Sequence, residues 1–534
     1  MYPVLKIQIG TYNSTKKEIS KDELDTIIWD MLYTLGVTTA FEITLTDKID
    51  FLTVNEHRCE FPASLVDEVT AYTLYLDKLN PETGKYWELL ISNILWLQPQ
   101  VLFPDECLTG YLPVLNSSSG EDHNEIKTLY KEIIAELLSL KISIADNSRI
   151  IEISNKYLRS SPIEWNDLRE ELIEALSGPE IAVFFHPDYF EHIIKARGRE
   201  NLFELMRDGL FYETGIKYPP FRLYFDKQLP LNAFYFKINS FTSIPCVGLL
   251  ENEVLVNDTP DRLSLIGIAG RAAINPANGN KCTIIESLNK KSAENARFTT
   301  WDSFGYFILG FSSFLRKYGY SCVDKKLIVQ NLKTLKLTFP KVGECIEKFN
   351  LLAVSVKTLR LLAKDGISIR NLQFILQAIV DSDYIIANGH THIIFEERIP
   401  VRQSEKTGWK SKAENIVEFV RARLKKSISY KYTSGQSTLI VYLLDPDIEI
   451  MIDPAISGRE NPDDENCKKI NEAVQNEIVN LPPASQVPVI LTTVNVRPHI
   501  KKIIEFNYPQ IAVLSYHELS PEMNIQPIAR ISFP

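Results

Sequence analysis

The sequence predicts an α+β protein of several domains, in which ferredoxin-like β-α-β modules are joined to an inserted small subdomain, a helical winged-helix-like subdomain and a C-terminal α/β subdomain. Three observations support this prediction. The chain has 534 residues, whereas single cores stop growing at roughly 250–300 residues. Its beginning reads as strand, helix and strand, and its end alternates strands with helices. Its composition, 45% hydrophobic and 24% charged, is typical of folded proteins.

Residues 1–115 are predicted to form an N-terminal α/β module. An opening strand is followed by a helix that begins at Ser20, whose spacing to Glu23 fits a capping box. The helix ends at Gly36, and residues 41–45 alternate as the next strand. The module therefore reads as a β-α-β unit.

Part of this module recurs later in the chain. Residues 31–45 align with residues 210–225 if one proline is inserted, and Gly36 then matches Gly215. The alignment predicts that the module is a degenerate repeat of a later subdomain. Coincidence stays open as the alternative, because any two amphipathic helices that end at glycine before a strand look alike.

The middle of the chain is predicted as a helical connector followed by two interleaved subdomains. A polar loop rich in serine opens the connector, residues 116–179. Strand and helix patterns predict one subdomain from residues 180–255 together with 319–340. Residues 256–318 between them are rich in Asn, Gly and Lys in their first half and end in a helix from Asp302, so they are predicted as an inserted second subdomain.

Residues 341–412 are predicted as a helical third subdomain with a hairpin. Two amphipathic helical patterns, 355–363 and 368–380, are separated by an Asp-Gly pair. The Asn-Gly pair at 388–389 predicts a hairpin turn whose first strand is 384–387. Helix-turn-helix with a wing is the resulting prediction.

The last segment, residues 413–534, alternates helices and strands. Its strand patterns occur at residues 439–444, 487–492, 511–515 and 525–531. Such alternation predicts a compact C-terminal α/β subdomain.

Charge and cysteine content exclude several classes of function. The chain carries 58 basic and 68 acidic residues, a formal charge of −10, which argues against nucleic acid as the partner. Its seven cysteines are scattered, which favours a reducing compartment over a disulfide framework. The start lacks a signal-peptide pattern, and the most apolar stretch, residues 304–315, is too short to cross a bilayer. We expect a cytoplasmic protein without direct membrane insertion, at most peripheral to a membrane.

Two functional alternatives come from short motifs. His390 and His392, beside the predicted hairpin turn, resemble one metal motif of calcineurin-like phosphoesterases, but the other ligands of a dinuclear site are absent. Arg370 and its polar neighbours in the helix-turn-helix segment are residue types that read DNA bases. A metal-dependent phosphoesterase and a DNA-binding regulator therefore remain as alternatives. The main prediction is a protein that is no enzyme and needs no metal or cofactor.

The C-terminal segment carries a family resemblance. Residues 489–504, the Ala-Val-Leu-Ser-Tyr-His-Glu-Leu string at 512–519 and the Asn-Ile-Gln-Pro-Ile string at 524–528 closely resemble the end of the FHIPEP family, the export-gate proteins of flagellar and virulence type III secretion. Motifs at 366–372, 318–324 and 229–239 resemble earlier parts of the cytosolic half of that family, in the same order. The resemblance spans about residues 180–534, and the membrane half of the family has no counterpart in this sequence.

The resemblance implies a function in binding other proteins. The family docks chaperone–substrate complexes in a groove marked by D-P-x-F-G, and this sequence matches it with Phe304 and Gly305, while Asp302 is one position off and Trp301 precedes it. A family threonine falls near Gln330. These five residues are the predicted partner-binding site. The predicted function is a binding scaffold for secretion chaperones, substrates or export components, as a monomer or a homo-oligomer.

Overall fold

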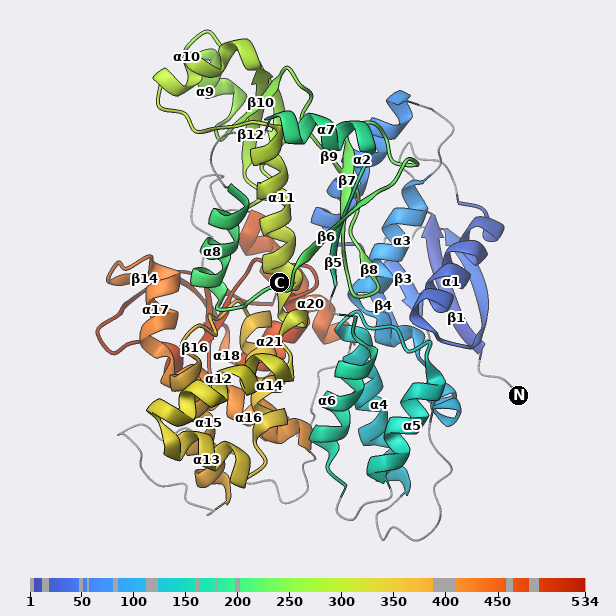
Figure 1. Cartoon of the computed structure of the whole chain (residues 1–534), viewed down its shortest axis with the longest axis vertical. Helices are drawn as coiled ribbons and strands as arrows, with labels where there is room; N and C mark the ends of the chain where they lie inside the picture. Colours follow the sequence, from blue (N-terminus) through green and yellow to red (C-terminus); the bar gives the residue numbers. More distant parts are fainter. Residues whose placement is uncertain are drawn as a thin grey trace. The chain divides into compact units, whose positions relative to one another are not determined.

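The computed structural model describes residues 4–11, 19–47, 51–54, 57–79, 85–111, 123–158, 163–178, 180–196, 202–387, 409–457, 464–479 and 489–533 (Figure 1). The chain forms two compact units. The first comprises Met1–Cys59, Ser64–Leu327 and Ser368–Arg370, and the second Glu60–Ala63, Ile328–Ile367 and Asn371–Pro534.

The first unit begins with a four-stranded sheet, sheet A. Its strands are β1 (Val4–Thr11), β2 (Ala40–Asp47), β3 (Phe51–Val54) and β4 (His57–Glu60), in the order β2-β1-β3-β4. The helix α1 (Lys21–Leu35) joins the parallel strands β1 and β2. The predicted capping box at its start and the left-handed glycine at its end, Gly36 with φ 80°, are both confirmed.

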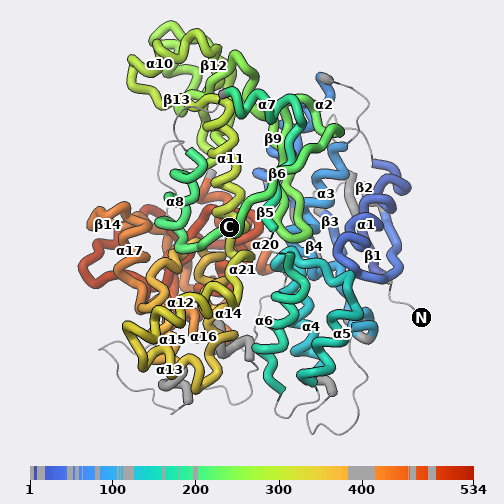
Figure 2. The backbone as a smooth tube through the Cα atoms, viewed as in Figure 1, coloured from blue at the N-terminus to red at the C-terminus, as the bar shows by residue number. Residues whose placement is uncertain are grey.

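Helices fill the rest of the N-terminal region. They are α2 (Ala63–Leu79), α3 (Tyr86–Leu97), α4 (His123–Ser139), α5 (Asn147–Leu158) and α6 (Trp165–Leu176), with short 3-10 turns η1 (Pro99–Leu102) and η2 (Asp105–Gly110). The helices α5 and α6 lie side by side (Figure 2). The first two of the five were not predicted from the sequence.

A second sheet, sheet B, follows in the same unit. Its strands are β5 (Ile181–Phe185), β6 (Phe221–Phe225), β7 (Ala233–Ile238), β8 (Phe241–Thr242) and β9 (Cys246–Val247), in the order β6-β5-β7-β8, with β9 also on β7. The helices of this part are α7 (Pro187–Ala196), α8 (Leu202–Thr214) and α11 (Ser303–Tyr318). Phenylalanine rings fill the space between α11 and the sheet. The ring centroids of Phe307 and Phe185 are 5.1 Å apart, and those of Phe311 and Phe236 are also 5.1 Å apart.

Sheets A and B have the same topology and the same register. In sheet A, Ile7 lies between Ile43 on the parallel neighbour and Val54 on the antiparallel neighbour. In sheet B, Val183 lies between Leu223 and Phe236 in the same way. The two parallel strands are direct neighbours in both sheets, so the predicted ferredoxin-like arrangement, in which a third strand separates them, is wrong. The connecting helices return the chain directly beside the strand it left, which is common for a β-α-β unit.

Each of these sheets also receives a short segment against the end of its helix. The Ile144 N–H donates a 2.8 Å hydrogen bond to the Leu35 carbonyl, and the Ile369 N–H donates an equally long one to the Thr214 carbonyl. We call residues 143–145 the first strap and Ser368–Arg370 the second strap. Sheet A, α1 and the first strap are the first frame; sheet B, α7, α8 and the second strap are the second frame.

The straps explain two glycines. Gly36 and Gly215 both follow the last helical residue with positive φ, 80° and 77°. A Cβ on Gly36 would lie 2.2 Å from the Ala145 backbone nitrogen, and one on Gly215 would lie 2.1 Å from the Arg370 nitrogen. Only glycine leaves room for either strap and adopts this backbone conformation without strain.

Segments beside the first frame contact the second frame within the first unit. The Ser240 N–H and the Asn239 side-chain amide donate 2.9 Å hydrogen bonds to the carbonyls of Lys141 and Leu140. Trp96 of α3 meets Phe241 at 5.8 Å between ring centroids. The loop that precedes the first strap therefore lies on the turn between β7 and β8.

A third sheet, sheet C, is inserted between β9 and α11. Its antiparallel strands are β10 (Glu253–Val256), β11 (Arg271–Ile274), β12 (Lys281–Glu286) and β13 (Thr300–Trp301), in the order β11-β12-β10-β13, with α9 (Pro260–Ser264), η3 (Ser287–Asn289) and α10 (Lys290–Asn295). Val254 and Val256 pack with Leu263 and Ile285 on one face, and Leu255 packs with Leu249 on the other.

Helices begin the second unit. After η4 (Gly319–Cys322) and α12 (Lys325–Thr338), which runs from the first unit into the second, they are α13 (Pro340–Lys348), α14 (Leu352–Lys364), α15 (Leu372–Ala387), α16 (Trp409–Arg423) and α17 (Lys425–Thr433). The predicted strand at 384–387 is wrong, because the apolar helical period of α15 continues to Ala387. The rest of the predicted wing, residues 388–396, lies outside the described residues.

The second unit ends in a parallel sheet, sheet D, which confirms the predicted alternation. Its strands are β14 (Thr438–Leu444), β15 (Val489–Thr492), β16 (Val513–Ser515) and β17 (Asn524–Ile531), in the order β16-β15-β14-β17, with helices α18 (Pro446–Ile452), α19 (Pro454–Ser457), α20 (Asp464–Val479), α21 (Arg497–Ile504) and the turn η5 (Tyr516–Glu518). Ile470, Ile490 and Ile500 are fully buried in its core. Among the helices of the described residues, none combines the length and the apolar character needed to cross a bilayer.

Candidate functional site

Four of the five predicted partner-binding residues meet where β13 passes into α11. Trp301 is half-buried and pairs with Leu255 in the sheet. Asp302 is the N-cap of α11, and its Oδ1 accepts a 2.8 Å hydrogen bond from the Gly305 N–H. A carboxylate suits this place, because it satisfies a free N–H at the positive end of the helix dipole.

The next residue, Ser303, ties the helix start to its neighbours. Its Oγ lies 2.7 Å from Nε2 of His192 on α7 and donates a 3.4 Å hydrogen bond to the Leu249 carbonyl. Ser303 is buried, so these contacts satisfy a hydroxyl that water does not reach. Sequence reasoning missed this pair, because 111 residues separate its members.

Phe304 and Gly305 support the site from inside. The Phe304 side chain is only 5% exposed, and its ring lies 6.3 Å from that of Phe307. A Cβ on Gly305 would lie 2.8 Å from Cε3 of Trp301, so glycine lets the indole pack against the helix. A partner at this point would therefore touch Trp301 and Asp302, while Phe304 and Gly305 hold them in place.

The fifth predicted residue is Gln330. Gln330 is exposed on α12 and belongs to the second unit. The site as described contains Trp301, Asp302, Phe304 and Gly305, together with His192 and Ser303.

The first of the two functional alternatives, a metal-dependent phosphoesterase, requires a metal centre. Among them, no three His, Cys, Asp or Glu side chains are grouped as metal ligands would be. Burial raises the pKa of Cys59 to about 12 and that of Cys282 to about 11, which keeps both thiols protonated at neutral pH. His390 and His392, the basis of the phosphoesterase alternative, lie outside the described residues.

The residues of the DNA-binding alternative make contacts within the chain. The Arg370 guanidinium donates to the Tyr212 carbonyl at 3.2 Å and lies over the Tyr212 ring. The Asn371 Oδ1 accepts from the Phe374 N–H, and the Gln377 amide donates to Asp381. These contacts do not favour a groove-reading role.

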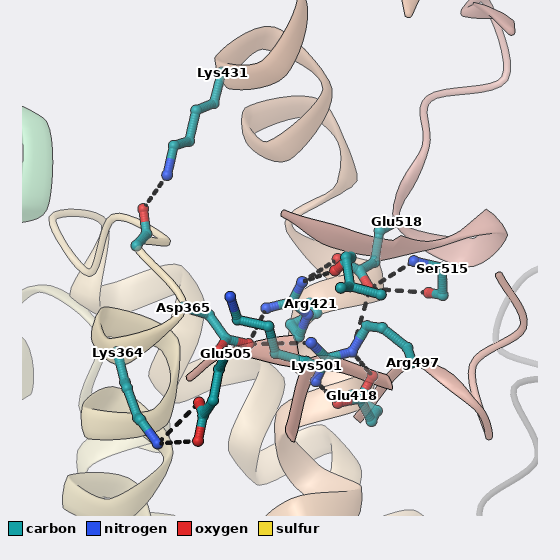
Figure 3. Close-up of polar contacts among 12 residues, drawn as sticks. Lys364, Asp365, Glu418, Arg421, Lys431, Arg497, Lys501, Glu505, Ser515 and Glu518 are labelled. Atoms are coloured by element: carbon teal, nitrogen blue, oxygen red, sulfur yellow. Dashed lines mark hydrogen bonds and ion pairs between the residues drawn. The ribbon is translucent and has the colours of Figure 1, made fainter. Parts of the chain in front are cut away.

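A buried ion network in the second unit was not predicted (Figure 3). Arg421 of α16 donates to Asp365 at 2.7 Å and to Glu518 at 2.6 Å. Arg497 of α21 donates to Glu418 at 2.8 Å and to the same Asp365 at 3.1 Å. The network thus joins α14, α16 and the sheet D subdomain by charged hydrogen bonds away from water.

Burial and charge act against each other in this network. Burial raises the pKa of Glu418 despite the nearby Arg497. Burial would also raise the pKa of Asp365, but the charges of Arg421 and Arg497 outweigh it and hold that pKa below its usual value. A sequence signal lies on α16, where Glu418 and Arg421 each stand between two apolar neighbours. Such pairs hold parts of a fold together and are costly to break.

Comparisons with known proteins connect these features to a family. A family model described as the FHIPEP family matches residues 155–524. The low calcium response locus protein D of Yersinia pestis is 22% identical over 346 residues, 61% of this chain and 44% of that protein. The flagellar biosynthesis protein FlhA of Bacillus subtilis is 21% identical over 330 residues, 61% of this chain and 45% of that protein. The chain thus spans about half the length of the curated relatives it matches.

Solved structures also resemble this chain. The CdsV protein of Chlamydia pneumoniae is 26% identical, with a TM-score of 0.57, over 66% of this chain and 98% of that chain. CdsV in a complex with the CdsO protein gives the same identity, with a TM-score of 0.56, over 66% of this chain and 97% of that chain. Over the 66% of the chain that is matched, the mixed α+β architecture is that of the CdsV structure.

Proposed function

Because this chain belongs to the FHIPEP family, we propose that it is a component of a type III protein export apparatus and works as a binding scaffold for other proteins of that apparatus. The observation that carries the proposal is the likeness to CdsV, which extends over 98% of that solved chain. CdsV is itself solved in a complex with another protein, CdsO. A binding role also suits a chain whose described residues assemble no metal cluster.

The proposed docking point is the start of α11. Trp301 and Asp302 are half-buried there, so each keeps part of its surface available to a partner. Aromatic side chains on a rigid element are frequent hot spots of protein interfaces. The hydrogen bonds of Asp302 and Ser303 fix the helix start, and the packing of Gly305 fixes the indole. The partners proposed are secretion chaperones, export substrates or a counterpart of CdsO.

The test measures binding of the full chain to these proteins from the same organism. Purified chaperones, with and without substrate, and the CdsO counterpart are titrated against immobilised wild type, Trp301→Ala and Asp302→Ala. Leu288→Ala is the matched control, because Leu288 is 86% exposed in the same inserted segment and lies on η3. Phe304→Ala is a poorer probe, since emptying a buried site costs about 3–5 kcal/mol of stability by itself.

Trp301→Ala is expected to weaken binding at least about tenfold, as loss of an interface hot spot does. Asp302→Ala should weaken it less, and the control should leave it unchanged. Equal binding by all three variants would remove the docking point and leave the scaffold role standing. A wild-type chain that binds none of the export proteins would overturn the scaffold role.

The division into subdomains is part of the same proposal. Sheet B with α11, the inserted sheet C, the helices of the second unit and sheet D are proposed as four subdomains. The phenylalanine contacts between α11 and sheet B favour an insertion near 253–301, narrower than the predicted 256–318.

The shared topology, register and strap support a degenerate repeat: we propose that the first frame is a second copy of the family's first subdomain. Light scattering of the full chain would decide between monomer and homo-oligomer.

A further inference from the structure

Each frame is a control for the other, because the paired strand positions of one frame correspond by register to those of the other. The strand β2 of the first frame and β6 of the second occupy the same outer position, each parallel to the central strand. By register, Phe41 corresponds to Phe221 and Ile43 to Leu223. A difference between β2 and β6 therefore reflects sequence and not position in the sheet.

The surfaces of these two strands differ. In β2, Ile43 is 5% exposed, and the exposed neighbours Glu42 and Thr44 are polar. In β6, Leu223 is 46% exposed and Phe225 is 57% exposed. One continuous helix, α1, packs on β2, whereas three helices, α7, α8 and α11, reach β6 through aromatic rings at Phe221 and Phe225. Phe203 of α8 reaches Phe221 and Phe190 of α7 reaches Phe225, so Leu223 is left between them.

The backbone edge of β6 is also open. Within the described part of the chain, β6 pairs with β5 alone. Proteins usually protect such an edge with lysine, proline or a bulge. Among the other edge strands, β17 has Pro527 and a register shift opposite it, and β2 presents the polar, exposed Glu42 and Thr44 beside its edge. The strand β6 has neither, and its single charge, Arg222, lies 3.7 Å from Glu180.

We propose that β6 is a docking edge that takes one extended, apolar polypeptide segment as an added strand. The open row of backbone donors and acceptors selects a strand over a helix as the occupant, because only an extended chain pairs with it. The exposed Leu223 and Phe225 select apolar side chains on one face. That the segment belongs to an export substrate rests on the proposed function. A component of an export apparatus meets incompletely folded substrates, and these expose extended apolar segments.

The opposite face of β6 adds a place for the alternate side chains. Tyr224 lies stacked on Phe184 at 5.1 Å and accompanies Lys237 and Ile142 in the wall of a cavity of about 300 Å³. Successive side chains of an added strand point to opposite faces of a sheet. One set would cover Leu223 and Phe225, and the other would lie beside Tyr224 at this cavity.

The experiment uses fluorescent eight-residue peptides of alternating valine and threonine and the full chain. One peptide is N-methylated at alternate residues, which leaves a single pairing edge and blocks fibril growth; a second is N-methylated at every residue and cannot donate. Fluorescence anisotropy measures the affinity of each for wild type, Leu223→Lys and Thr44→Lys. Thr44→Lys is the matched control, since it adds the same charge to the exposed part of β2.

The open-edge peptide should bind wild type and Thr44→Lys alike, and bind Leu223→Lys at least about tenfold more weakly, because a lysine protects an edge. The fully methylated peptide should also lose at least about tenfold. Leu223→Thr replaces Leu223→Lys if the lysine variant loses its helical circular dichroism. Equal binding of both peptides, equal loss in both lysine variants, or no binding up to about 1 mM would each overturn the docking edge.

The outcome is separable from the proposed function. If the peptide does not bind at β6 while chaperones or the CdsO counterpart still bind the full chain, the export role stands and only the docking edge is refuted. If β6 binds peptides while no export protein binds, the edge stands and its partner lies outside an export apparatus.

Discussion

The two frames of the first unit share a backbone plan but differ in what they leave exposed. Both have three strands in the same register, a helix that ends at a left-handed glycine, and a strap bonded to that helix end. The first frame buries Ile43 where the second leaves Leu223 nearly half exposed. The comparison teaches that one backbone plan can bury a side chain at an outer-strand position in one frame and expose its counterpart in the other.

The helices that follow the straps extend the comparison to buried charge. On α6, Arg169 is fully buried and bonds its neighbour Glu170 at 2.9 Å. On α16, Arg421 is also buried, but its partners Asp365 and Glu518 are far apart in sequence. The first arginine contacts Glu170 on its own helix and Glu136 on α4, whereas the second ties α16 to the sheet D subdomain.

The largest effect is expected when the buried contacts of Arg421 are removed. Arg421→Met should cost about 3–5 kcal/mol of unfolding free energy, because it leaves the Glu518 and Asp365 carboxylates without a main partner away from water. Arg169→Met should cost less, because its second carboxylate, Glu136, lies 3.9 Å away, whereas both carboxylates of Arg421 lie within 2.7 Å. Urea unfolding of the full chain, followed by circular dichroism, measures both. Equal losses would mean that the two arginines are alike in their importance.

The next effect compares matched positions in β2 and β6. Ile43→Ala should cost about 3 kcal/mol and Leu223→Ala about 1 kcal/mol, because the loss grows with the burial of the side chain that is removed. The same urea titration measures the pair. A larger loss at Leu223 would show that this part of β6 is covered in solution.

A smaller effect tests the straps. Gly36→Ala and Gly215→Ala should each cost about 2 kcal/mol or more, because each places a Cβ against strap backbone at positive φ. Gly209→Ala is the control: its Cβ meets nothing within 4 Å on α8, so it should be neutral or slightly stabilising. A loss at only one of the first two glycines would contradict the equivalence of the straps.

The smallest effect is a pH dependence confined to the second unit. Asp365 has a lowered pKa in the folded chain, so its contribution to stability is complete above its ordinary value of 3.8 and is lost as pH falls through the lower folded value. The raised pKa of Glu418 acts in the opposite direction. Asp365→Asn should therefore flatten the acid side of the stability curve. Thermal unfolding from pH 5 down to about pH 2.5 checks this, and an unchanged acid slope would refute it.

Much of the local structure could be predicted from the sequence. The strand at 41–45, the capping box at Ser20 and the alternation in the last 120 or so residues follow from period and capping, which involve close neighbours only. The family followed from motifs in a fixed order and agrees with the match over residues 155–524. The helices α2, α3 and α7 escaped prediction.

The candidate site shows where such prediction stops. The sequence predicted a point of interest at Trp301–Gly305 through a family motif, and the structure brings four of those residues together at one helix start. The sequence did not decide whether Phe304 is buried; the structure leaves its side chain only 5% exposed. The bond between His192 and Ser303 is long-range.

The sequence by itself determined the local elements, the glycine stops at Gly36 and Gly215 and the family, because each depends on residues close in the chain or on a conserved order of motifs that the chain carries on its own. The tertiary structure alone decided that the parallel strands of each frame are neighbours, that Arg421 meets Asp365 and Glu518, and that β6 has an open edge. The reason is physical: strand pairing, burial and ion contacts depend on partners distant in sequence, and the local periodicity of a segment does not specify which partner it contacts.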